Sequence, residues 1–212
     1  MDWGCIGGGL FRHVDLMMVD LLPLFLFVVV MVGTPGHANM VLMTAGASFG
    51  FSRAIPFLLG ITFGKLMLNL MMGFGVYDVL ETYPIILDGL KYISAIYVIY
   101  LSVQMARQPL GDSADLSKAP GFLAGVIVHP LNPKAWAMMT IAWADYGGQI
   151  EDPLWRVVII SGTFLCVQLC AHSFWCLAGD RLMGLIRNDR TKTLIQQGLA
   201  ALTALVVLIV IL

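Results

Sequence analysis

Two short stretches of this sequence, GTPGHANM at residues 33–40 and HPLNPKAW at residues 129–136, decide how the chain folds. Each contains a proline, Pro35 or Pro133, inside a long apolar segment. Proline lacks a backbone N–H, and its ring clashes with the carbonyl four residues earlier, so it interrupts a helix. In lipid, the backbone groups freed by such an interruption must face protein or a water-filled cavity. We therefore expect both breaks to face the protein interior.

The segments around these breaks are too hydrophobic for an ordinary soluble domain. Of the 212 residues, 59% are hydrophobic and 12% are charged, and the mean hydropathy is +0.86. Soluble domains carry roughly 25% charged residues. The formal net charge of -1 provides no basic surface, so nucleic acid is not an expected partner. The composition predicts an integral membrane protein whose surroundings are lipid.

Six segments are long and apolar enough to cross a bilayer as helices, which takes about 20 mostly apolar residues. All of them exceed the roughly 9–11 residues of a membrane-spanning β-strand. The predicted fold class is an all-α integral membrane protein with six transmembrane helices, forming a single transporter domain over residues 1–212. The spans are expected at residues 21–48, 55–77, 84–106, 120–144, 154–178 and 194–212.

Three spans fall in each half of the chain, residues 1–113 and residues 114–212. The second half therefore enters the membrane from the opposite side, and any internal repeat must be inverted. Pro35 and Pro133 interrupt the first helix of their halves, which predicts two inverted three-helix repeats with broken helices 1 and 4. Corresponding interruptions in inverted repeats indicate the binding site of a transporter.

Around these breaks the chain resembles the LysE/RhtB family of amino-acid exporters, the lysine and homoserine/threonine efflux group. Residues 34–39 match its TPGPN-like break, residues 49–56 its FGxRxGxP-like cytoplasmic link, and residues 132–134 its NPK motif. The resemblance extends over nearly the whole chain in length and hydropathy. It implies a secondary exporter of amino acids or related small zwitterionic metabolites in the bacterial cytoplasmic (inner) membrane, driven by proton antiport.

The breaks offer a site for an anionic group. Each half-helix that follows a break begins with roughly half a positive charge and several unpaired N–H donors. In inverted halves the two N-termini meet near the midplane, which suits a carboxylate. Polar residues there either contact the substrate, directly or through water, or only cap the half-helices. The candidate substrate-binding residues are Thr34, Gly36, Asn39, Lys65, Asn69, Asn132 and Lys134.

Lys65 is unusual because it lies near the middle of the second span, where a lysine costs about 2.5–3.5 kcal/mol. The family has a neutral side chain there. Asn69 shares its helix face, as Gln168 and His172 share one in the fifth span, so we expect a polar cavity, with snorkelling of Lys65 as the alternative. No Asp or Glu lies in the central part of any span. Lys65 is then either neutral or paired with an extra anionic or strongly electronegative group on the substrate.

His37 and His129 are the candidates for carrying the coupling proton, because the ordinary pKa of histidine lies nearest neutrality. The alternative is that each is a structural, hydrogen-bonded histidine. His172 shares its helix with three cysteines, yet it lies about 160° around that helix from Cys170. A metal site is therefore not expected, and no cofactor is expected either.

Other functions require features that this sequence lacks. A metal-ion exporter of the same superfamily would need a His-rich or acid-rich segment, whereas the four histidines are scattered. A membrane-embedded enzyme would need a paired nucleophile and base, and a thiol carrier a CxxC motif. The expected partners are a small-molecule substrate, protons and membrane lipid. The GxxxG spacings Gly46/Gly50, Gly60/Gly64 and Gly121/Gly125 predict close helix packing within the bundle or a homodimer.

The charge distribution gives a testable topology. Cytoplasmic loops carry an excess of Lys and Arg, which places residues 179–193 inside and both termini outside. Single-cysteine labelling of intact cells, in a background without the four native cysteines, should find positions near Gly148 accessible and residues 179–193 protected. Labelling in the opposite pattern would reverse the assignment.

Overall fold

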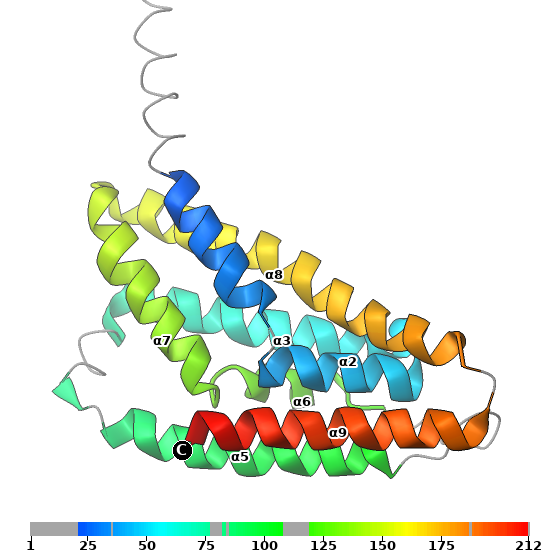
Figure 1. The fold of residues 1–212 in the computed structure, drawn as a ribbon. Helices are drawn as coiled ribbons and strands as arrows, with labels where there is room; N and C mark the ends of the chain where they lie inside the picture. The colour runs from blue at the N-terminus through cyan, green and yellow to red at the C-terminus, as the bar shows by residue number, and fades with distance from the viewer. Residues whose placement is uncertain are drawn as a thin grey trace, which may run out of the picture.

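The computed structural model describes residues 21–34, 36–76, 82–83, 85–107, 119–186 and 188–211, and it contains helices and turns but no strands over these residues. The predicted all-helical class is therefore confirmed for this part of the chain. Figure 1 shows the arrangement. In chain order, the elements are a first helix Leu21–Gly33, α2 His37–Phe49, α3 Phe51–Met71 with the π-helical turn Met72–Val76, α5 Ile85–Ala106, α6 Phe122–Val128, α7 Pro133–Ile141 with the turns Ala142–Tyr146 and Gly147–Gln149, α8 Pro153–Gly184, and α9 Asp189–Ile211.

Two of the described helices, Phe51–Val76 and Pro153–Gly184, are long and apolar enough to cross a membrane on their own. The bent pair formed by the first helix and α2 meets the same criterion when taken as one span. The prediction placed the start of the second span too late in the chain. Helix α3 begins at Phe51, four residues before Ile55, because Gly50 adopts a φ of 80° that ends α2 and lets α3 start at once.

Both expected breaks are present in the backbone. The first helix and α2 are bent by 53° relative to each other, and Figure 1 shows the change of direction between the two blue helices. Residues 129–132 form the turn between α6 and α7. Pro133 is the first residue of α7, a position where the missing N–H costs no helical hydrogen bond. It therefore starts the second half-helix. Pro35 lies outside the described residues.

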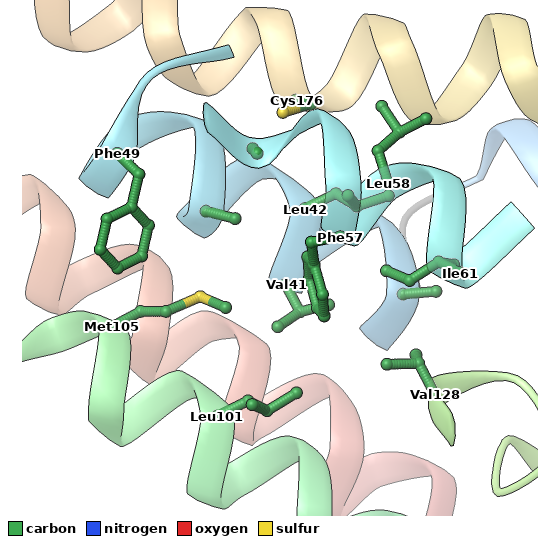
Figure 2. Close-up of a cluster of buried hydrophobic side chains, with 13 residues drawn as sticks. Val41, Leu42, Phe49, Phe57, Leu58, Ile61, Leu101, Met105, Val128 and Cys176 are labelled. Carbon is green, nitrogen blue, oxygen red and sulfur yellow. The ribbon is translucent and has the colours of Figure 1, made fainter. Parts of the chain in front are cut away.

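A buried apolar cluster joins helices from both halves of the sequence. Figure 2 shows Val41 and Leu42 of α2 and Phe57 of α3 facing Leu101 of α5 and Val128 of α6. Because lipid tails are as apolar as these side chains, close packing rather than removal from water stabilises such contacts in a membrane. The cluster therefore depends on how closely the helices approach one another.

Glycine permits that close approach between α2 and α8. A Cβ atom at Gly46 would collide with the backbone carbonyl of Cys176, and one at Gly179 would collide with the carbonyl of Met43. The two helices therefore touch backbone to backbone at these points.

The contact between α3 and α6 is built in the same way, through Gly60, Gly64 and Gly125. Most of the predicted small-residue positions thus pack inside the bundle. Gly50 ends a helix instead, and a Cβ atom added at Gly121 would have no neighbouring atom within 4 Å. The homodimer remains a prediction.

Substitution of these glycines should separate contact positions from open ones. We expect Gly179→Ala to destabilise the protein by ~1–3 kcal/mol, the usual cost of overpacking. Gly162, in the same helix, has no atom within 4 Å of an added Cβ, so Gly162→Ala should be neutral or stabilise by up to about 1 kcal/mol. Thermal unfolding in detergent measures the stability of both variants. Equal unfolding midpoints for the two would contradict the close contact of Gly179 with α2.

Candidate functional site

One cavity lies where the two breaks approach each other. Its walls come from the first helix, the first break, α2, α3, the turn between α6 and α7, α7 and α8. The cavity volume is about 20 Å³, which is room for about one water and far too little for an amino acid. The walls therefore leave no room for a substrate in this structure. The lining residues are Met31, Val32, Thr34, Gly36, His37, Ala38, Asn39, Lys65, His129, Asn132, Lys134, Met138, Gln168 and His172.

At the first break, Asn39 replaces the backbone hydrogen bonds that the interruption removes. Its Nδ2 donates to the carbonyl of Val32 at 2.7 Å and to the carbonyl of Thr34 at 2.9 Å. From α8, the indole Nε1 of Trp175 donates to the carbonyl of Gly33 at 3.2 Å. Both amide hydrogens of Asn39 are used in this way. Asn39 is thus a cap, and only its Oδ1 is left to face a substrate.

At the second break, Asn132 caps α7 in the usual sense. Its Oδ1 accepts from the backbone N–H of Ala135 at 3.2 Å, and its Nδ2 lies 3.5 Å from Nδ1 of His129. The indole of Trp136 donates to the carbonyl of Pro130 at 2.8 Å. The turn between the two half-helices is therefore held by side chains on both sides of it.

Lys134 connects the two breaks. Its Nζ donates to Oγ1 of Thr34 at 2.9 Å, although the two residues are 100 positions apart. A Cβ atom at Gly36 would lie 3.4 Å from this Nζ. The Lys134 side chain therefore lies beside the N-terminus of α2, at the distance of an ordinary van der Waals contact. Thr34, Gly36 and Lys134, which sequence analysis named separately, meet at one place.

Lys65 points into the protein, so the snorkelling alternative is wrong. Only 1% of its surface is exposed. Its Nζ donates to the carbonyl of Ala135 at 3.2 Å and lies 4.9 Å from the centre of the Phe164 ring, within the range of a cation–π contact.

Asn69 is the one predicted binding residue that the structure does not bring to the cavity. Its Nδ2 lies 3.4 Å from the carbonyl of Lys65, one turn earlier on α3, and its Oδ1 accepts from the indole of Trp143 at 3.4 Å. It is buried, but it does not line the cavity. Asn69 thus lies one turn beyond Lys65 on α3, facing the turn Ala142–Tyr146.

The two histidines proposed for proton coupling differ in their surroundings. His37 is the first residue of α2 and is 3% exposed, and its buried Nε2 has no hydrogen-bond partner among the described residues. His129 has a polar neighbour at each ring nitrogen, with Nε2 lying 3.0 Å from the side-chain nitrogen of Gln168. His129 also stacks on His172 at 5.6 Å between ring centres.

Several residues that support the cavity were not predicted from the sequence. Oγ1 of Thr62 lies 3.4 Å from Nδ1 of His172, and its position three residues before Lys65 on the same helix face is a signal that was present in the sequence. No such signal marked Phe164 or Trp175, because aromatic residues in an apolar span are usually expected to face lipid.

The three cysteines that the structure describes do not line the cavity. Cys176 is buried in the apolar cluster of Figure 2, whereas Cys166 and Cys170 are exposed on α8. In the part of the chain that the structure describes, no group of three or more His, Cys, Asp or Glu side chains is placed to hold a metal ion.

The ionisable side chains that line the cavity are all bases, two lysines and three histidines. The N-termini of α2 and α7 lie at the same site. The lining residues all come from residues 21–77, 116–144 and 153–179, and these stretches contain no Asp or Glu. The arrangement is suited to binding a carboxylate or another anionic group.

Comparison with known proteins agrees with this geometry. A cysteine/O-acetylserine efflux protein of Salmonella choleraesuis is 23% identical over 155 residues, covering 73% of this chain and 80% of the relative, and that of Salmonella typhimurium gives the same values. An uncharacterized membrane protein of Pseudomonas aeruginosa is 30% identical over 90 residues, 42% of each chain. No solved structure matches the chain. Residues 29–212, which include both breaks, match the family described as LysE type translocator. This chain therefore belongs to the LysE type translocator family, and it is a membrane transporter and not an enzyme.

Proposed function

We propose that this protein is a secondary exporter of amino acids or related small zwitterionic metabolites in the bacterial inner membrane, and that the cavity between the breaks binds the substrate. The observation that carries the proposal is the hydrogen bond from Lys134 to Thr34, which brings both breaks to one point. Family membership and the relatives named as cysteine/O-acetylserine efflux proteins support a small amino acid as substrate. The positively charged lining disfavours a metal cation.

The N-terminus of α2 is the better place for the carboxylate of the substrate. No side chain caps this helix, so its first N–H groups are left for a ligand, whereas Asn132 already caps α7. Lys134 lies beside the same N-terminus and adds a full positive charge. The free Nε2 of His37 is placed to accept a hydrogen bond from the amino group.

The packing of the helices supports two inverted repeats related by the breaks. Such a repeat pairs the first helix with α6, α2 with α7, α3 with α8, and α5 with α9. The first helix packs on α8 through Leu24 and Phe164, as α6 packs on α3. Likewise Met139 of α7 shares an apolar cluster with Leu68 of α3, a smaller counterpart of the extensive packing of α2 on α8. Transport then requires this small cavity to widen and to open toward each side of the membrane in turn.

His37 is the better candidate for the coupling proton. Protonation adds a donor to each unprotonated ring nitrogen. Protonation of His37 at Nε2 breaks no hydrogen bond, because this nitrogen has no hydrogen-bond partner among the described residues. His129 is instead enclosed by Gln168, Asn132 and His172, so we assign it a structural role.

The first test is efflux from proteoliposomes preloaded with a panel of amino acids. The wild-type protein should release at least one of them, and Lys134→Met should release it at least tenfold more slowly, because the charge beside the α2 N-terminus is lost. Lys192→Met is the matched control, since Lys192 lies 3.8 Å from Asp189 in the first turn of α9, away from the cavity. Equal rates for Lys134→Met and the control would place the site elsewhere.

A second test separates the two histidines. If His37 carries the proton, acidifying the external buffer should accelerate efflux by the wild-type protein, and His37→Gln should lose this acceleration while still allowing downhill efflux. His129→Gln should keep the acceleration and lower the thermal unfolding midpoint. Acceleration that survives in His37→Gln would assign the coupling to another group.

A further inference from the structure

Lys65 is a buried basic side chain, and the described residues supply no acidic partner for it. Its ammonium group has three donors, and the structure gives it one carbonyl acceptor, that of Ala135, and the face of Phe164. A buried charge is costly unless it is paired and hydrogen-bonded. Ionisable residues inside a membrane face the bundle interior and mark substrate pathways. Lys65 lines the cavity, so its unfilled donors lie at the substrate site.

The other basic side chains of the cavity do not pair with Lys65. Lys134 donates to Thr34, while His129 lies beside Gln168 and stacks on His172. The acidic side chains that the structure describes lie toward the ends of α7, α8 and α9, not along the cavity walls. The three stretches that form these walls contain no Asp or Glu in the sequence. The walls of the cavity therefore supply no anion to Lys65, and an anion that pairs with it would come from a bound molecule.

The cavity offers two separate places for an anion. One is formed by Lys134, Gly36 and the uncapped start of α2. The other is formed by Lys65, beside Ala135 and Phe164. The buried, unpartnered Nε2 of His37 lines the same cavity and is an independent sign that a polar ligand belongs there. A zwitterion with one carboxylate would fill the first place only.

We infer that the substrate carries a second anionic group bound by Lys65, and that the site selects a short acidic amino acid over its neutral isostere. This inference rests on the proposed function and names the substrate class of the same site. The chain offers a short diacid two cationic positions on adjacent walls, since Lys134 and the carbonyl that holds Lys65 belong to consecutive residues of α7. A structural lysine that only anchors Ala135 is the opposing explanation.

Binding to the purified protein in detergent tests the inference without requiring transport. Thermal unfolding is followed with L-aspartate, L-asparagine and succinate at increasing concentrations. L-aspartate should raise the unfolding midpoint at concentrations at least tenfold lower than L-asparagine. The reason is that L-asparagine has a neutral amide in place of the side-chain carboxylate that would face Lys65. This comparison uses the wild-type protein, so it holds even if a variant fails to fold.

Variants then assign the selectivity to Lys65. Lys65→Met should reduce the preference for L-aspartate over L-asparagine to less than threefold, Lys65→Arg should keep part of it, and Lys192→Met should keep all of it. Equal binding of L-aspartate and L-asparagine to the wild-type protein, or stabilisation by neither, would overturn the inference. A preference for L-aspartate over L-asparagine that persists in Lys65→Met would also overturn the inference.

Succinate and the efflux assay separate this inference from the proposed function. If succinate stabilises the protein as well as L-aspartate and no amino acid leaves the proteoliposomes, the diacid site stands and amino-acid export is wrong. If neutral amino acids are exported and L-aspartate gains no preference in binding, export stands and the inference is wrong.

Discussion

The need to pair backbone groups inside lipid determines the architecture of this protein. A helix broken within the membrane exposes carbonyl and N–H groups that lipid cannot satisfy. In this chain the amide of Asn39 and the indole of Trp175 satisfy the carbonyls at the first break, and Asn132 satisfies an N–H at the second. All three side chains come from elements that surround the cavity. At the polar site, side chains thus supply hydrogen bonds that the backbone of both broken helices lacks.

The same constraint explains why capping and binding are difficult to separate here. Asn39 and Asn132 use their side chains for the backbone, so their removal would change the shape of the site as well as its chemistry. Lys134, Lys65 and His37 retain groups that the protein does not fully use. These three side chains therefore keep more unused hydrogen-bonding capacity than the two asparagines do.

The sequence was sufficient to predict the helical membrane fold, the breaks and most of the cavity. Proline within apolar segments has a direct backbone consequence, and a lysine without an acidic neighbour must face the interior. Asn69 shows the limit of such reasoning, because a shared helix face did not reveal that its side chain bonds to Trp143 instead. The contact of Trp175 with Gly33 joins residues 142 positions apart, and no local pattern predicts it. The start of α3 at Phe51 depended on the φ of Gly50 rather than on Pro56.

The glycine contacts of α2 with α8 and of α3 with α6 have a mechanical consequence. Each joins a helix from the first half of the sequence to one from the second, backbone against backbone. Backbone atoms in such contact leave little room for one helix to slide past the other. A motion that separated the two halves of the sequence would therefore have to break both glycine contacts. A motion that kept them would have to bend the chain elsewhere, for instance at the turn formed by residues 129–132.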